Sequence, residues 1–133
     1  MVFMSDVEVT VTSTPENYKT ILKASLHELI ADESKENGGQ DLGPSPHEYL
    51  LLALGACTSI TLRMYAEVKK MDLQNVSVVL NLTKGKDHTE IERIVTVQGN
   101  LNEKERERLL HAANACPIHK VLTSPIKIDT KLF

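Results

Sequence analysis

The chain has 133 residues, the usual size of one domain, and its apolar (41%) and charged (25%) fractions are those of a soluble globular protein. The formal net charge of −3 gives no reason to expect binding to nucleic acid or to an acidic membrane surface. The low aromatic content of 4% and the lack of Trp also argue against a surface on which nucleic-acid bases stack.

The N-terminal stretch, the apolar stretches and the number of cysteines favour a cytoplasmic protein. The N-terminal stretch MVFMSDVEVT has no basic segment followed by an apolar core, so we expect no signal peptide. The longest uncharged apolar stretch, around Tyr49 to Cys57, is shorter than the roughly 18 residues of a membrane span. Two cysteines are too few for a disulfide scaffold. We therefore predict a cytoplasmic protein that does not bind membranes and whose cysteines rest as thiols.

The N-terminal part of the chain is predicted to be a small sheet. Valines at positions 7, 9 and 11 alternate with polar residues, which is typical of a half-buried strand over residues 7–13. Residues 18–32 are rich in β-formers but too long for one strand, so we expect a break near Ala24 to Leu26 and strands at 18–24 and 27–32. The polar stretch ESKENGGQDLGPSP then predicts a loop long enough to be functional.

A long helix is predicted over residues 46–70. Ser45 is a good N-cap, Pro46 fits the first helical position, and Glu48 stands three residues after the cap. From Leu50 to Cys57 nearly every residue is apolar or small, which predicts burial on all sides. The helical spacing predicts that Cys57 faces packed structure or a pocket floor, in a stripe made of Leu50, Leu54, Cys57, Thr61 and Met64.

The rest of the chain predicts an α+β domain in which an antiparallel sheet packs with helices. Strands are expected at 76–83 and 90–99, the first with Val76, Val78, Leu80 and Leu82 on one face. Asn102 caps a helix over 103–123 that breaks at Pro117, and the alternating residues 126–132 predict a last strand.

Cys116 has the more informative local setting. Pro117 fits best as the first residue of a new short helix, which makes Cys116 its N-cap and favours the thiolate over the thiol. A kinked helix with cysteine as a spacer is the alternative, and Cys57 is equally compatible with a small core residue. Cys116 and His119 also have a zinc-like spacing, but only Cys57 is left as a sulfur ligand, so we expect no metal site.

The motifs GPSPHEYLLLALGACTSITL and ACPIHKVL together resemble the OsmC/Ohr family of osmotically inducible and organic hydroperoxide resistance proteins. The resemblance extends along essentially the whole chain, is closest to the OsmC-like branch, and implies one OsmC-like domain over residues 1–133. It implies an intertwined homodimer with each site near the subunit interface.

The resemblance also implies a reaction. Family members reduce hydroperoxides with two cysteines and no metal, flavin or other cofactor. By this resemblance Cys57 attacks the O–O bond and becomes a sulfenic acid, Cys116 resolves it as a disulfide, and a thiol reductant resets the pair. The family's acidic partner corresponds best to Glu48, for which a capping box with Ser45 is the alternative role.

Two features leave the function open. The family's peroxidases use an arginine from an N-terminal loop, whereas this chain has no arginine before Arg63, which lies about 240° around the helix from Cys57. The local argument also makes Cys116 the more acidic thiol, although the resemblance makes Cys57 the attacking one. The alternatives are a dimeric redox-sensing or small-ligand-binding domain without efficient turnover, and a structural dimer with two core cysteines.

Overall fold

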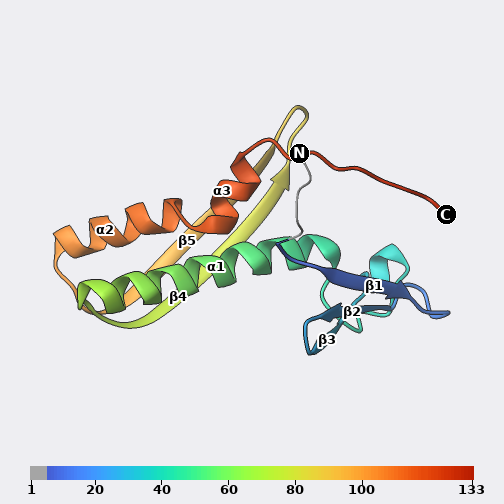
Figure 1. Ribbon diagram of the computed structural model, residues 1–133, viewed down its shortest axis with the longest axis horizontal. Helices are drawn as coiled ribbons and strands as arrows, with labels where there is room; N and C mark the ends of the chain where they lie inside the picture. The colour runs from blue at the N-terminus through green and yellow to red at the C-terminus, as the bar shows by residue number, and fades with distance from the viewer. Residues whose placement is uncertain (1–5) are drawn as a thin grey trace. The chain divides into compact units, whose positions relative to one another are not determined.

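The computed structural model describes residues 6–133 and divides the chain after Leu50 into two compact units (Figure 1). Each unit contains one antiparallel sheet. Of the three α-helices in the described residues, one lies between the two sheets in chain order and two follow the second sheet. The predicted α+β class is confirmed. The extent of the domain as a single unit over 1–133 stays a prediction.

The first sheet is a meander of three short strands. These are β1 (Val9–Ser13), β2 (Thr20–Ala24) and β3 (His27–Ala31), in the order β1-β2-β3. The predicted break between the second and third strands is confirmed, and Ser25 takes a positive φ of 56° in the turn. The expected strands 7–13, 18–24 and 27–32 are each slightly longer than the observed ones.

Asp32 organises the loop that follows β3, a loop that includes the short helix η1 (Lys35–Asn37). The Asp32 side chain is only 2% exposed, and its carboxylate accepts hydrogen bonds at 2.7–3.2 Å from the backbone N–H groups of Tyr18, Glu33, Gln40 and Leu42. Burial raises the pKa of Asp32, but the four N–H donors outweigh burial and lower the pKa below its ordinary value.

The helix α1 (Pro46–Lys69) confirms the predicted helix 46–70. Its start is fixed by a reciprocal cap in which the Ser45 N–H donates to Glu48 Oε1 at 2.9 Å and the Glu48 N–H donates to Ser45 Oγ at 3.3 Å. The Tyr49 hydroxyl donates to the carbonyl of Ile30 at 2.7 Å, which ties the first turn to β3.

The second sheet is a long hairpin formed by β4 (Asp72–Lys84) and β5 (Thr89–Asn100), both longer than the predicted strands 76–83 and 90–99. The inward face of β4 is half-buried and consists of the four predicted residues Val76, Val78, Leu80 and Leu82. On the opposite face Val79 and Ile94 are 55% and 49% exposed. One face of this two-stranded sheet is therefore covered and the other is open in the chain.

The helices α1, α2 (Glu103–Asn114) and α3 (Pro117–Thr123) accompany the hairpin (Figure 1). The break at Pro117 is confirmed, and Asn102 and Glu105 form a capping box at the start of α2. The core of this unit brings together residues of α1, β4 and α2, namely Leu62, Ala66, Leu73, Leu109, Ala112 and Ala113.

The stripe predicted for α1 is wrong, and the burial predicted on all sides is not present in the single chain. The buried stripe consists of Leu54, Thr58, Leu62 and Ala66, whereas Leu50 and Met64 of the predicted stripe are 41% and 63% exposed. Leu52 is 53% exposed, so the run from Leu50 to Cys57 is not buried on all sides in the chain. The physical reason is that a two-stranded sheet covers one side of a helix. By length and composition α1 is also apolar enough to cross a membrane, a criterion that core helices of soluble proteins meet too.

The predicted strand 126–132 is wrong as well. Residues 125–133 form neither a strand nor a helix, and Ile128 and Leu132 are 82% and 97% exposed. Alternation of apolar residues supplies a face, but a strand also needs a neighbouring edge to pair its N–H and C=O groups. Within residues 6–133 no strand pairs with this segment.

We expect Asp32→Asn to lower the melting temperature by roughly 5–10 °C near neutral pH, because an amide has a single acceptor oxygen for four N–H donors. Since folding lowers the pKa of Asp32, its stabilising effect is complete above the ordinary aspartate pKa of about 3.9 and is lost as the pH falls through the folded-state value. The difference in melting temperature should therefore shrink in acid. Circular dichroism melts of both proteins, with Asp87→Asn as an exposed control, test this, and a pH-independent difference would contradict it.

Candidate active site

The fold brings the two cysteines together although they are far apart in the sequence. Cys57 lies in the middle of α1, Cys116 is the N-cap of α3, and the Cys57 thiol is one of the nearby groups that lower the pKa of Cys116. Both are free thiols. The backbone N–H of Ile118 donates to Cys57 Sγ at 3.5 Å, so the first turn of α3 contacts both sulfurs.

The two thiols differ in access. Cys116 is 0% exposed, whereas Cys57 is half-buried. Burial raises the pKa of the Cys116 thiol, but hydrogen bonds from the His119 N–H, the Cys57 thiol and the Arg93 guanidinium outweigh it and hold the pKa below its ordinary value. The N-cap position predicted for Cys116 is confirmed.

Thr58 contacts both Cys116 and Arg93. Its hydroxyl oxygen is 3.9 Å from Cys116 Sγ and accepts a hydrogen bond from Arg93 Nη1 at 3.0 Å. The single hydroxyl proton is donated to the carbonyl oxygen of Leu54 at 2.7 Å. That proton is therefore not available to the Cys116 sulfur.

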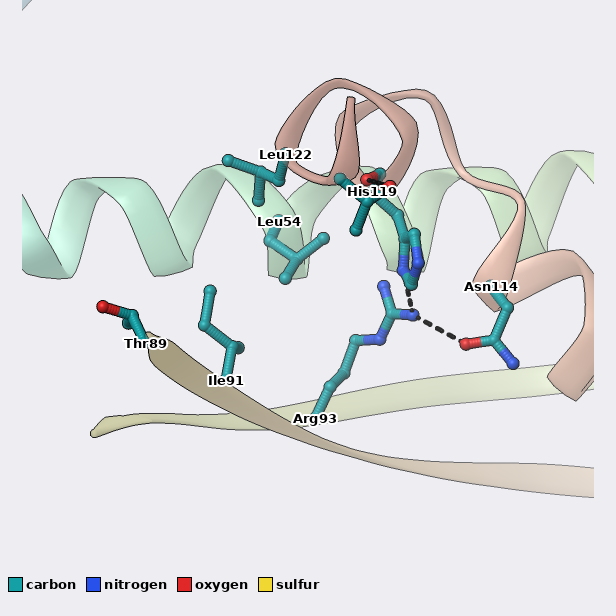
Figure 2. Close-up of a pocket in the computed structure, with 8 residues that line it drawn as sticks. Leu54, Thr89, Ile91, Arg93, Asn114, His119 and Leu122 are labelled. Atoms are coloured by element: carbon teal, nitrogen blue, oxygen red, sulfur yellow. Dashed lines mark hydrogen bonds between the residues drawn. The ribbon is translucent and has the colours of Figure 1, made fainter. Parts of the chain in front are cut away.

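Arg93 of β5 forms hydrogen bonds with residues around Cys116. It lies on the inward face of β5, and its Nη1 donates to Cys116 Sγ at 3.8 Å. Its Nη2 donates to Asn114 Oδ1 at 3.2 Å and contacts His119 Nδ1 at 2.9 Å (Figure 2). Because a guanidinium only donates, Nδ1 of His119 is the acceptor and the ring proton is on Nε2. Among residues 6–133 the one ion pair is between His88 and Glu90, so none of these acceptors is a carboxylate.

A cavity of about 390 Å³ opens beside Arg93, a size typical of small-molecule sites. Figure 2 shows Arg93, Asn114 and His119 gathered at one end of it, with Leu54 and Ile91 toward the other. The remaining lining residues are Thr89, Leu122 and Thr123. The cavity therefore has a polar end next to the cysteine site, and the rest of its lining is mixed, with leucine, isoleucine and threonine side chains.

The structure does not show Glu48 as the acidic partner of the cysteines, the role that the family resemblance implies. Its carboxylate accepts from the backbone N–H and bonds the side chain of Ser45, which lowers the pKa of Glu48. Nine residues of one continuous helix, roughly 13 Å, separate it from Cys57. The capping role is present in the structure, and a role as acidic partner stays a prediction.

Arg63 and His119, the two other side chains considered in the sequence analysis, each form hydrogen bonds with other parts of the chain. Arg63 donates to the carbonyl oxygens of Leu73 at 2.6 Å and Gln74 at 3.2 Å, so its guanidinium is bound to the start of β4. His119 lies near Cys116 but uses Nδ1 to accept from Arg93. In the part of the chain that the structure describes, no group of three or more His, Cys, Asp or Glu side chains is placed to hold a metal ion.

Arg93 is the site residue that the sequence analysis missed. The strand sequence EIERIVTVQG places Arg93 on the same face as Ile91, Val95 and Val97, all of which are half-buried. A charged residue on the apolar face of a strand needs a partner in the interior. This break in the alternation was the available signal.

The comparisons with known proteins agree with this architecture. A family model described as OsmC-like protein matches residues 38–131. A Psychrobacter arcticus structure, described as an osmotic stress induced and detoxification response protein, has a TM-score of 0.76 at 19% identity and covers 91% of each chain. No curated protein matches the chain.

Two further similar structures are described as organic hydroperoxide resistance proteins. The one from Legionella pneumophila has a TM-score of 0.65 at 20% identity and covers 92% of each chain. The one from Vibrio cholerae, with captopril bound in one of its active sites, has a TM-score of 0.63 at 18% identity and covers 90% of this chain and 87% of its own. At these identities the structures establish the fold, and the family model matches well over half of the sequence, so the chain belongs to the OsmC-like protein family.

Proposed function

We propose that the chain is a thiol-dependent hydroperoxide reductase that works through the Cys57 and Cys116 pair. The observation that carries the proposal is the proximity of a half-buried thiol to a fully buried one, since the N–H of Ile118, two residues after Cys116, donates to Cys57 Sγ at 3.5 Å. Membership of the OsmC-like family and the similarity to organic hydroperoxide resistance proteins support a peroxide-handling role.

Access supports Cys57 as the attacking thiol. A peroxide reaches the half-buried Cys57 more readily than Cys116, which is 0% exposed. The Cys57 sulfur attacks the terminal peroxide oxygen, the O–O bond breaks, and the products are a sulfenic acid on Cys57 and the alcohol. The Ile118 N–H, 3.5 Å from Cys57 Sγ, stabilises negative charge on the attacking sulfur.

Proximity supports Cys116 as the resolving thiol. The Cys116 sulfur is close to that of Cys57 and shielded from solvent, so it can react with a sulfenic acid on Cys57 but not readily with a molecule in solution. The Cys116 sulfur attacks Cys57, the S–S bond forms and the sulfenic oxygen leaves as water after protonation. A thiol reductant then returns both cysteines to thiols. A cytoplasmic location, where such reductants are abundant, is part of the proposal.

A homodimer is also part of the proposal. One face of α1 is apolar and open in the chain, and it consists of Leu52, Ile60, Met64 and Val68, which are 53–76% exposed. The open face of the hairpin adds Val79 and Ile94. Exposed apolar surface of this kind, on a helix face and on a sheet face, marks interaction sites. A second copy of the chain is the partner that the family resemblance implies.

One observation favours the alternative function, a redox-sensing or small-ligand-binding domain. The cavity beside Arg93 has the size and the mixed lining of a ligand site. In that case the chain would react once with peroxide, or bind a ligand, without repeated turnover. Steady-state peroxide consumption in the presence of a dithiol distinguishes the two functions.

Treatment with a small excess of cumene hydroperoxide should join Cys57 and Cys116 in one intramolecular disulfide, because the two sulfurs are already close. Intact-mass spectrometry should show the loss of two hydrogens, and peptide mapping should identify the bridge. Cys116→Ser is the matched control that cannot form it. Unreacted thiols, or bridges formed only between chains, would contradict the proposed pair.

The roles of the two thiols should separate in single-cysteine variants. Cys57→Ser should consume no peroxide even in a single turnover, because the remaining sulfur is shielded from solvent. Cys116→Ser should react once and leave a sulfenic acid on Cys57 that dimedone labels and that excess peroxide converts to sulfinic acid. The measurement is dimedone labelling resolved by peptide. A label on Cys116 in Cys57→Ser, with none on Cys57 in Cys116→Ser, would reverse the assignment.

Light scattering at micromolar concentration should give the mass of a dimer. Met64→Glu should weaken the dimer at least about tenfold, because it places a charge in the middle of the apolar face of α1. Lys69→Glu, at the exposed C-terminal end of the same helix, is the control and should leave the mass unchanged. A monomeric wild-type chain would speak against the dimer.

A further inference from the structure

We propose that Arg93 is a positioning residue of the redox pair, which supplies the positive charge that keeps the Cys116 sulfur negative in the resting dithiol and ready to close the disulfide. The placement of the charge on Cys116 stands on geometry alone. The disulfide-closing step rests on the proposed function. The guanidinium acts on the buried second cysteine and comes from a strand, so it differs from the N-terminal loop arginine that the family resemblance implies.

The distances place one guanidinium nitrogen at the Cys116 sulfur. Arg93 Nη1 is 3.8 Å from Cys116 Sγ, and that sulfur is 0% exposed. Water therefore cannot solvate a negative charge there, so a thiolate at this position needs a countercharge from the protein. At about 4 Å the attraction between opposite charges is much stronger in a protein interior than in water.

The other partners of Arg93 leave its charge available. They are the hydroxyl of Thr58, the amide oxygen of Asn114 and the ring nitrogen of His119, which are all neutral acceptors. In the residues that the structure describes, no ion pair neutralises Arg93. The Cys116 sulfur is thus the group among its contacts that can carry the compensating negative charge.

The elements around Cys116 also fix the direction of the guanidinium. Asn114 and His119 hold Nη2, and Thr58 holds Nη1, so the planar fork is oriented with one N–H toward the sulfur. The titratable or charged groups facing this sulfur are Cys57 from α1, Arg93 from β5 and His119 from α3. A lysine ammonium would supply the positive charge but not the two parallel N–H donors of the planar guanidinium.

The chemical consequence concerns the second step of the reaction. The Cys116 thiolate donates an electron pair to the sulfenic sulfur of Cys57, the S–S bond forms, the S–O bond breaks, and hydroxide leaves. A thiol at Cys116 would first have to lose its proton inside a site that excludes water. Loss of Arg93 should therefore slow closure of the disulfide and prolong the sulfenic acid, which then has time to be over-oxidised.

The direct test is the titration of Cys116 in a Cys57→Ser background, followed by the ultraviolet absorbance of the thiolate. With Arg93 present, the measured pKa should lie below the value of about 8.5 for a free cysteine. Arg93→Met should raise it by roughly 1–3 units, and Arg93→Lys should give an intermediate value. Arg108→Met, which removes an exposed arginine of α2, is the matched control and should leave the titration unchanged.

A second measurement follows the rate. With both cysteines present, rapid mixing with peroxide should show disulfide closure at least about tenfold slower in Arg93→Met than in the wild type, with more sulfinic acid on Cys57. An unchanged Cys116 pKa in folded Arg93→Met would overturn the inference. If circular dichroism shows that Arg93→Met does not fold, the Cys116 pKa measured with Arg93 present is the deciding result. A Cys116 pKa at or above that of free cysteine would then overturn the inference.

The titration uses no peroxide, so failure of the proposed function is recognised separately. If Cys116 titrates as expected but the wild-type chain consumes no peroxide, the reductase activity is overturned and the charge assignment of Arg93 is supported. If peroxide is consumed while Cys116 titrates independently of Arg93, the reductase activity is supported and the inference is overturned.

Discussion

A guanidinium on the apolar face of the β4–β5 hairpin is the feature on which the arrangement of the site depends. Arg93 bonds Thr58 of α1, Asn114 at the end of α2, and Cys116 and His119 at the start of α3. A half-buried cation needs several acceptors to offset the hydration that it loses. These partners come from the middle of α1, the end of α2 and the start of α3, and the two cysteines lie beside them in the same places.

In this site one sulfur is accessible to solvent and the other has the lowered pKa. The half-buried Cys57 can meet a substrate, whereas the buried Cys116 has the donors that lower its pKa. The local sequence argument for an acidic Cys116 and the family resemblance for an attacking Cys57 are therefore compatible. Under the proposed function, access decides which thiol the peroxide meets, and the acidity of the neighbouring sulfur governs how fast the disulfide closes.

The features predicted correctly from the sequence are those that local chemistry decides. The caps at Ser45 and Asn102, the restart of a helix at Pro117 and the break between β2 and β3 each depend on a few adjacent residues. The errors concern what lies across the fold. Burial around Leu52 requires a cover on the outer side of α1, and a strand at 126–132 requires an edge to pair with, and neither can be read from periodicity.

Placement of the cation on a strand has a consequence for the order of events. A residue in the middle of a long hairpin, paired with Leu80 of β4, is held in place by the ladder on both sides. Its field at Cys116 is present before any substrate arrives and costs no rearrangement when the sulfenic acid forms. An arginine on a loop would be in place only when the loop is closed. Under the proposed function, this fixed charge favours the resolving step, which shortens the time during which Cys57 is exposed to further oxidation.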